Sequence, residues 1–294
     1  MDTNNKTAVL TGSKGAIGSE LTKLLAQSGW NLALINRTQA KSDAQLAQLR
    51  GSFPGQRFDG WIVDLMDTNQ VKDVVSKLVS AYARIDALYN VSGLLTDQRI
   101  MSPQGVEGHF ALNTLAPYML IQGLRPSLRR AFPSQLATGA SDGDRSVIAN
   151  FSSSAVNAVK EIDVAQLRNP DKIGGLMDAY AKSKLALTAV TCLLKEELLE
   201  ENVLIYSVDP GATKSSMTKR SKGMPPLLRL LAPLLFKSPD RQAMKIIKGI
   251  EAAVTDGKSG LFISNGKLKS NPPLVLDKIF QSDLQALLQN LSTP

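Results

Sequence analysis

Tyr180 and Lys184 place a phenol and an ammonium group four residues apart in a stretch with strong helical character. Residues at this spacing lie on one face of a helix, one turn from each other. A free tyrosine has a pKa of about 10 and is a poor acid or base at neutral pH, but a neighbouring ammonium favours its phenolate. The pair therefore predicts general acid–base chemistry. A pair on a helix surface is the alternative, because the YxxxK spacing is common by chance.

Three consecutive serines, Ser152, Ser153 and Ser154, follow an apolar run at residues 146–150. Open α/β sheets place ligand-facing groups at the carboxyl ends of their strands. A hydroxyl in that position can donate a hydrogen bond to an oxygen on which negative charge develops. We therefore expect one of these serines to complete the site of Tyr180 and Lys184.

A glycine-rich segment, TGSKGAIG at residues 11–18, follows the first apolar run of the chain. Glycines permit a tight turn and let backbone N–H groups approach a pyrophosphate, and the start of the next helix adds a favourable dipole. After a strand and before a helix, such a turn indicates dinucleotide binding. The expected cofactor-binding residues of this turn are Gly12, Ser13, Lys14, Gly15, Ile17 and Gly18.

Asn36 and Arg37 end the next apolar run, where an acidic residue would bind the ribose 2′-hydroxyl of NAD and repel an additional phosphate. Arg37 instead offers a planar, permanently charged group that suits a phosphate. NADP(H) is therefore the predicted cofactor, and a solvated arginine at a helix start is the alternative. An oxidised nicotinamide beside Tyr180 would add to the ammonium in favouring the phenolate. Lowering the tyrosine pKa by ~3 units corresponds to ~4 kcal/mol of differential stabilisation.

Short apolar or β-branched runs alternate with amphipathic helical windows along most of the chain. This alternation predicts an α/β fold with a doubly wound, Rossmann-type parallel sheet, helices on both faces and one domain over residues 1–294. The predicted helical windows are 19–27, 68–83 and 180–199. The predicted strands are 7–10, 32–35, 60–63, 87–89, 146–150, 204–208 and 261–263.

The ordered motifs resemble those of the short-chain dehydrogenase/reductase family, from Thr7 to about Ile263. TGSKGAIG is similar to the family's TGxxxGxG turn, and NVSG at residues 90–93 resembles its NNAG motif. Asp64, followed by Leu65, resembles the acidic residue that contacts adenine. PGATKS at residues 210–215 resembles PGxVxT. The resemblance implies cofactor contacts at Asp64, Leu65, Asn90, Gly93, Tyr180, Lys184, Pro210, Gly211, Thr213 and Ser215.

The same resemblance implies a catalytic set of Asn113, Ser153, Tyr180 and Lys184. The implied reaction is hydride transfer between the nicotinamide and a carbonyl or alcohol carbon of a small molecule. Tyr180 would exchange the proton, Ser153 would hydrogen-bond the substrate oxygen, and Lys184 would hold the ribose and lower the Tyr180 pKa. Asn113 would support a water-linked proton path.

Two departures from the family pattern carry information. Tyr180 follows Ser153 by 27 residues, more than the commonest family spacing. A similar long insert occurs in the retinol-dehydrogenase-like branch, whose helix pattern also resembles GVEGHFALN at residues 105–113. Ala16 stands where the turn usually has a glycine, and we expect its methyl group to crowd the pyrophosphate slightly.

Composition excludes several other classes of site and partner. The chain has one His, His109, and one Cys, Cys192, so it cannot form a His/Cys metal site or an intramolecular disulfide. The 34 Lys and Arg against 26 Asp and Glu are spread along the chain without a recognition motif, so no nucleic-acid partner is expected. The amino terminus lacks the apolar region of a signal peptide, and the apolar run at 227–236 is too short for a membrane span. We therefore expect a cytoplasmic protein.

Residues 213–236 combine a polar first half with an apolar second half, and we expect them to form a mobile lid over an apolar substrate. A helix packed on the core or on a partner subunit is the alternative, which leaves a homodimer open. A helical extension is expected at about 272–291. Two other functions remain as alternatives: a non-catalytic NADPH-binding sensor or scaffold, and a nucleotide-sugar epimerase or dehydratase, since TGSKGAIG also fits TGxxGxxG.

Overall fold

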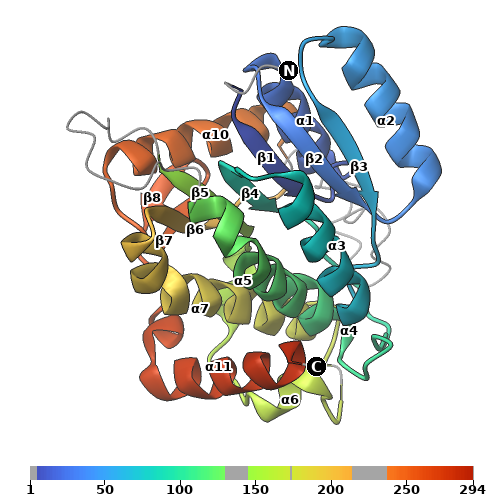
Figure 1. Cartoon of the computed structure of the whole chain (residues 1–294). Coiled ribbons are helices and arrows are strands. Elements are labelled where there is room, and N and C mark those ends of the chain that lie inside the picture. Colours follow the sequence, from blue (N-terminus) through green and yellow to red (C-terminus); the bar gives the residue numbers. More distant parts are fainter. Residues whose placement is uncertain (1–4, 130–144, 173, 214–236, 294) are drawn as a thin grey trace.

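Eight strands form one sheet in the order β3-β2-β1-β4-β5-β6-β7-β8 (Figure 1). A computed structural model describes residues 5–129, 145–172, 174–213 and 237–293. Neighbouring strands are parallel except β7 and β8, which are antiparallel. The strands are β1 Thr7–Thr11, β2 Asn31–Asn36, β3 Phe58–Ile62, β4 Ala87–Asn90, β5 Ser146–Phe151, β6 Val203–Asp209, β7 Leu261–Ser264 and β8 Lys267–Lys269.

The predicted doubly wound sheet is confirmed, and each of the seven predicted strands is present. Strand β8 was not predicted, because this lysine-rich edge strand has no apolar run. The helices are α1 Ala16–Gln27, α2 Gln39–Ser52, α3 Thr68–Ala81, α4 Gly108–Phe110, the π-helix η1 Ala111–Leu115, α5 Ala116–Arg129, η3 Ser154–Ala158, α6 Ala165–Arg168, α7 Asp178–Glu200, α10 Pro239–Thr255, η4 Pro273–Leu276 and α11 Lys278–Ser292.

Helices cover both faces of the sheet (Figure 1). Helices α1, α2 and α10 pack with one face into one buried apolar cluster, and α3, α5 and α7 form the other cluster on the opposite face. In α1, Ile17, Leu21 and Leu25 recur every four residues and turn one stripe towards the sheet. Helix α7 lacks such a clear stripe because it is covered on two sides, by the sheet and by α11 and η4.

The carboxyl ends of the central strands meet at one edge of the sheet. The register pairs Thr11 of β1 with Asn90 of β4, Asn90 with Asn150 of β5, and Asn150 with Ser207 of β6. From β1 the next strands along the chain are added on one side of the sheet, up to β3, and from β4 onwards they are added on the other side. The strand order therefore reverses between β1 and β4, and open α/β sheets bind ligands at such a switch point. The loops after these strands therefore bring the predicted motifs together.

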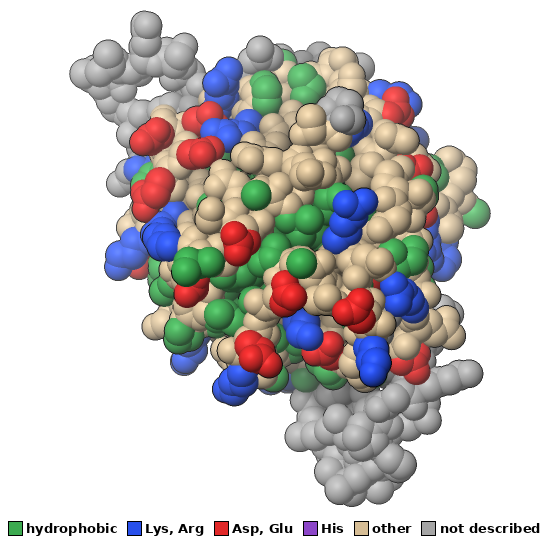
Figure 2. All heavy atoms as spheres, turned by 90° about the horizontal axis from the view of Figure 1, so that it is seen from below, with side chains coloured by type: hydrophobic (Ala, Val, Ile, Leu, Met, Phe, Trp, Pro, Cys, Tyr) green, Lys and Arg blue, Asp and Glu red, His purple; other side chains and the backbone are tan. Residues whose placement is uncertain are grey.

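The face below α11 and α6 carries Lys and Arg side chains interspersed with Asp and Glu around hydrophobic side chains (Figure 2). No helix among the described residues has the length and hydrophobicity to cross a membrane.

Of the expected lid at 213–236, only Thr213 lies within the described residues. The carboxy-terminal segment forms η4 and α11, and α11 packs against α7.

Candidate active site

A cavity of about 1190 Å³ opens at the carboxyl edge of the sheet, around the loops that follow β1, β4, β5 and β6. Ser13, Asn90 and Asn113 do not line it, and Ser215 lies outside the described residues. The predicted residues that line the cavity are Gly12, Lys14, Gly15, Ile17, Gly18, Arg37, Asp64, Leu65, Gly93, Ser153, Tyr180, Lys184, Pro210, Gly211 and Thr213. Most of the residues predicted from separate motifs therefore share one cavity.

The glycine turn after β1 brings backbone segments closer than side chains would allow. Gly12 has a φ of +68°, and a Cβ atom there would lie 2.8 Å from the Ser92 Oγ. A Cβ atom on Gly18 would lie 2.2 Å from the carbonyl oxygen of Gly12. Ala16 is the first residue of α1, so its methyl group requires no unusual backbone conformation. Gly12, Gly15 and Gly18 line the cavity, so the turn meets it without side chains at these positions, as the motif predicts.

Ser13 acts from behind the lining, together with residues of β2 and α2. Its Oγ lies 2.9 Å from Asn36 Oδ1 and 2.7 Å from Gln45 Oε1, and the Gln45 Nε2 donates to the Ser13 carbonyl oxygen at 3.1 Å. Asn36 lines the cavity, and its Nδ2 is buried without a partner among the described residues. A buried amide donor without a protein acceptor is costly, which favours an acceptor supplied by a ligand.

Three exposed cations, Lys14, Arg37 and Lys41, line the cavity together with Asn36. Arg37 and Lys14 were predicted here, whereas Lys41 was missed. The signal that could have indicated it is its place in the first turn of α2, which begins at Gln39, shortly after the end of β2. The cations and the free amide donor together make this end of the cavity suited to an anion.

Asn90 joins a buried polar chain instead of lining the cavity. The Asn90 Nδ2 donates to Asn150 Oδ1 at 2.9 Å, and the Asn150 Nδ2 donates to the Thr191 Oγ1 at 3.1 Å. The Ser207 hydroxyl donates to the same Thr191 oxygen at 2.9 Å. These bonds tie β4, β5, β6 and α7 together beneath the site, so the Asn90 side chain supports the cavity from below.

Tyr180, Lys184 and Ser153 meet at the cavity, as their motifs predict. The Lys184 Nζ lies 5.9 Å from the centre of the Tyr180 ring and donates to the carbonyl oxygen of Phe151 at 2.6 Å. Ser153 hydrogen-bonds to the Tyr180 side chain. The tyrosine and the lysine come from α7 and the serine from the end of β5, so the site depends on how α7 packs across the sheet.

Asn113 lies in the π-helix η1, a local widening that is frequent at functional sites. Its Oδ1 accepts from the Leu94 N–H at 2.7 Å, and its Nδ2 donates to the Leu94 carbonyl oxygen at 3.1 Å and to the Ser183 Oγ at 2.9 Å. A Cβ atom on Gly93 would lie 3.4 Å from Asn113 Oδ1 and 3.5 Å from Lys184 Nζ. Asn113 therefore holds the loop after β4 beside Lys184.

The expected lowering of the Tyr180 pKa is not found in the protein alone. Burial raises the pKa of Tyr180, the hydrogen bond to Ser153 lowers it, and the negative charge of Asp209 raises it. Burial also lowers the pKa of Lys184 to about 7, so its positive charge is only partly present at neutral pH. The sequence pattern predicts that the two groups meet, but it does not predict how far burial shifts the pKa of each.

Asp209 is a further residue of the cavity wall, which was not predicted from the sequence. It ends β6, is buried and lines the cavity. Its Oδ1 accepts from the Gly211 N–H at 2.9 Å, and its Oδ2 accepts from the Ser264 hydroxyl at 3.0 Å. Its position directly before Pro210 and Gly211 could have indicated it, because these two residues were already expected to contact the cofactor.

Replacing Asp209 by asparagine is expected to shift the pH profile of turnover to lower pH. The variant removes a negative charge that disfavours the Tyr180 phenolate, so the pKa of Tyr180 falls. An asparagine can still accept from the Gly211 N–H. The measurement is kcat against pH in the alcohol-oxidising direction, with Asp256→Asn, outside the cavity, as a control. An unmoved profile would contradict this role of Asp209.

The part of the cavity wall around the Tyr180 and Ser153 segments is largely apolar. Residues after β4, in η1 and before α7 contribute aliphatic side chains there. Met177 is one of them and is 47% exposed although its side chain is large and apolar. The apolar members are Leu94, Leu95, Leu112, Ala155, Leu176 and Met177. One cavity therefore contains a cationic end, an apolar wall and the Tyr180–Lys184 pair.

Comparison with known proteins places this geometry in a family. Residues 6–160 match the sequence profile described as short chain dehydrogenase, which is more than half of the chain. The chain belongs to the short-chain dehydrogenase family. Family membership makes it an oxidoreductase and confirms the resemblance that the motifs predict, and the matched region contains the glycine turn, Asn113 and Ser153.

The similarity extends beyond the matched region. The chain is 25% identical to retinol dehydrogenase 13 of Homo sapiens over 93% of this chain and 80% of that protein. It is 26% identical to polyprenol dehydrogenase of Homo sapiens over 90% of this chain and 78% of that protein. The fold is similar to that of NADPH-bound carbonyl reductase from chicken fatty liver, with a TM-score of 0.67, 19% identity and coverage of 90% and 99% of the two chains. These relatives confirm the resemblance to the retinol-dehydrogenase-like branch that the sequence motifs indicate.

Proposed function

We propose that the protein is an NADP(H)-dependent oxidoreductase acting on a carbonyl or alcohol of a lipophilic small molecule. The observation that carries this proposal is the convergence of Tyr180, Ser153 and Lys184 on the cavity that also contains the glycine turn. The residues fit a dinucleotide: the glycine turn lines the cavity, and the Asn36 Nδ2 has no acceptor among the described residues. A bound nicotinamide dinucleotide would supply or accept the hydride.

The chain's own residues handle the proton and the developing charge. Tyr180 donates its phenolic proton to the substrate oxygen during reduction and accepts it during oxidation. Ser153 donates a hydrogen bond to the same oxygen, where negative charge develops. Lys184 has one hydrogen-bond acceptor among the described residues, the Phe151 carbonyl, which leaves N–H bonds for ribose hydroxyls. Asn113 holds the adjoining loop and supports a water-linked proton path.

The preference for NADP(H) is supported by the anion-suited end of the cavity. Asn36 offers an amide donor because its oxygen lies against Ser13, and Lys14, Arg37 and Lys41 surround the same region. An additional phosphate on the adenosine ribose would find donors and positive charge there, whereas no carboxylate at the end of β2 binds a 2′-hydroxyl.

Replacing Arg37 by alanine is expected to raise the Kd for NADPH by roughly ten- to a hundredfold and to change the Kd for NADH by less than about twofold. The lost contact is a charge-assisted hydrogen bond worth ~1.5–3 kcal/mol. Equilibrium titration of both cofactors measures the effect. Lys23→Ala, an exposed lysine of α1 outside the cavity, removes the same charge as a control. Tighter binding of NADH than NADPH by the unmodified protein would contradict the preference.

A lipophilic substrate is supported by the apolar wall and by the names of the relatives, which denote dehydrogenases of retinol and polyprenol. The test is a panel of aldehydes, ketones and alcohols of increasing chain length with NADPH or NADP⁺, followed by absorbance of the reduced cofactor. We expect turnover that improves with chain length. Binding of NADPH without turnover would favour a sensor or scaffold instead, and conversion of a nucleotide sugar without net cofactor consumption would favour an epimerase.

A further inference from the structure

His109 is the single histidine of the chain, is fully buried and has no part in the mechanism above. Its Nδ1 lies 2.8 Å from Glu107 Oε1, and its Nε2 lies 3.2 Å from the backbone nitrogen of Thr96. The Thr96 N–H can only donate, so the Nε2 accepts and the Nδ1 carries the hydrogen that is donated to Glu107. The two bonds therefore select one neutral tautomer and fix the plane of the ring.

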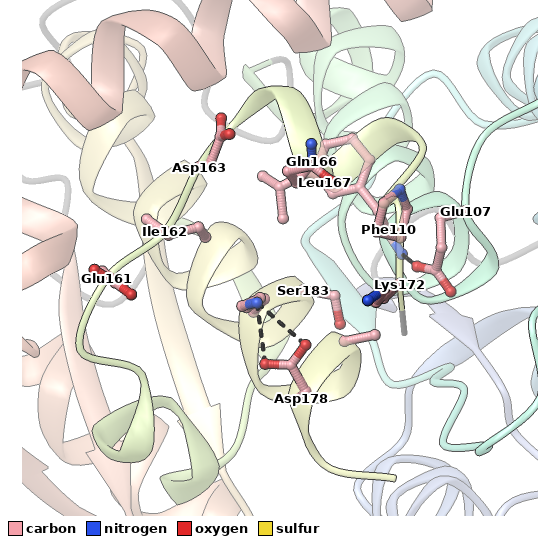
Figure 3. A pocket seen from close by; sticks show the side chains of 13 residues that line it. Glu107, Phe110, Glu161, Ile162, Asp163, Gln166, Leu167, Lys172, Asp178 and Ser183 are labelled. Atoms are coloured by element: carbon pink, nitrogen blue, oxygen red, sulfur yellow. Dashed lines mark hydrogen bonds and ion pairs between the residues drawn. The ribbon is translucent and has the colours of Figure 1, made fainter. Parts of the chain in front are cut away.

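Glu107 is anchored at the start of α4. Its Oε2 accepts from the Phe110 N–H at 3.1 Å, and its own backbone N–H donates to the Arg168 carbonyl oxygen at 2.7 Å. The other side of Glu107 lines a second cavity of about 330 Å³, which also touches Phe110 and Ser183 (Figure 3). With only 3% of Glu107 exposed, its carboxylate is a fixed acceptor that orients the His109 ring.

The partner of His109 belongs to the wall of the active-site cavity. Leu94 and Leu95 line that cavity, and Thr96 follows them directly. Asn113 holds Leu94 through both atoms of its amide, and His109 holds Thr96 two residues further on. Both anchors come from the continuous α4–η1 helix. The apolar segment 94–96 is therefore fastened at each end by one rigid element.

We propose that His109, oriented by Glu107, is a positioning residue that fixes the segment 94–96 and thereby sets the selectivity of the site between long-chain and short-chain carbonyl substrates. The selectivity part rests on the proposed function. Leu95 lies between the two anchors and lines the cavity, so freedom of the segment at Thr96 moves this apolar wall. Tyr180, Ser153 and Lys184 lie on other elements and keep their places.

Two matched variants separate the bond to Thr96 from the bond to Glu107. His109→Asn keeps a donor for Glu107 but is too short to accept from the Thr96 N–H. His109→Gln has the length to reach Thr96 and is expected to restore the anchor. In both variants the Glu107 Oε2 still accepts from the Phe110 N–H, so the buried carboxylate keeps a donor. The cofactor Kd is expected to stay within about twofold of the unmodified value in both.

Hydrogen exchange of residues 93–98 in the protein without ligands is the first measurement. We expect exchange to be about tenfold faster in His109→Asn and unchanged in His109→Gln, as befits the loss of one net hydrogen bond. Steady-state kinetics with NADPH is the second. In His109→Asn the KM for a long-chain aldehyde is expected to rise and its selectivity over a short-chain aldehyde to fall about tenfold, with kcat within about twofold and rescue by His109→Gln.

Unchanged exchange in His109→Asn would overturn the positioning role. Faster exchange with an unchanged selectivity ratio would overturn the role in selectivity and leave the proposed oxidoreductase activity standing. Absence of turnover by the unmodified protein would instead refute the proposed function, and the exchange measurement would still decide whether His109 holds the segment.

Discussion

Replacing Tyr180 by phenylalanine is expected to lower kcat by about a thousandfold while the Kd for NADPH stays within about twofold. The phenylalanine ring fills the same space beside Lys184, but it has no proton to exchange with the substrate oxygen, and positioned general acid–base groups contribute roughly 10²–10⁴ in rate. The two measurements are steady-state kcat with the best substrate of the panel and equilibrium titration of the cofactor.

Tyr118→Phe is the matched control. Tyr118 is a buried tyrosine of α5 outside the active-site cavity, so losing its hydroxyl is expected to leave kcat unchanged. Retention of most activity by Tyr180→Phe would show that another group supplies the proton, and the roles assigned to Ser153 and Lys184 would then need revision too.

Replacing Lys184 by methionine is expected to stabilise the protein without ligands while it removes activity. Burial lowers the pKa of Lys184 to about 7, so folding at neutral pH either buries an ammonium group or removes its proton, and both cost free energy. A shift of this size corresponds to at most about 5 kcal/mol. Methionine leaves the Phe151 carbonyl without its donor, which takes back ~1–3 kcal/mol. We expect a net gain of a few kcal/mol at pH 7 and a fall in kcat/KM of more than about a hundredfold.

The gain in stability depends on pH in a definite direction. Above about pH 7 the folded protein loses the Lys184 proton, whereas the unfolded chain keeps it until the ordinary lysine pKa of about 10.4. The unfolded state binds more protons in this window, so the stability of the unmodified protein rises with pH at this residue. The advantage of Lys184→Met is therefore largest below pH 7 and closes towards pH 10.

Urea unfolding of both proteins between pH 6 and pH 10 measures this difference. Lys182→Met is the control, because Lys182 is on the same helix, is partly exposed and pairs with Asp178 at 3.0 Å. It is expected to have little effect on stability. A difference between Lys184→Met and the unmodified protein that stays constant with pH would contradict the lowered pKa.

The sequence by itself determined the order of the strands along the chain, the doubly wound class and most of the site. The glycine turn, Arg37, a serine at the end of β5 and the Tyr180–Lys184 pair could be predicted because each depends on local spacing or on its place at the end of one element. Strand ends in a parallel sheet share one edge, so assigning the strands also predicted that these residues meet. Ser153 needed the family resemblance, since spacing alone did not distinguish it from its neighbours.

Contacts between distant segments were decided only by the tertiary structure. Ser13 meets Gln45 from 32 residues away, the Asn36 Nδ2 is buried without a partner among the described residues, and Asn90 joins a polar chain beneath the cavity. The pKa values of Lys184 and Tyr180 depend on how completely the packed chain removes water from each group. The four-residue spacing of the two side chains does not predict that burial. Spacing along one element predicts which groups meet, but their charge and their free hydrogen-bonding atoms depend on everything that packs around them.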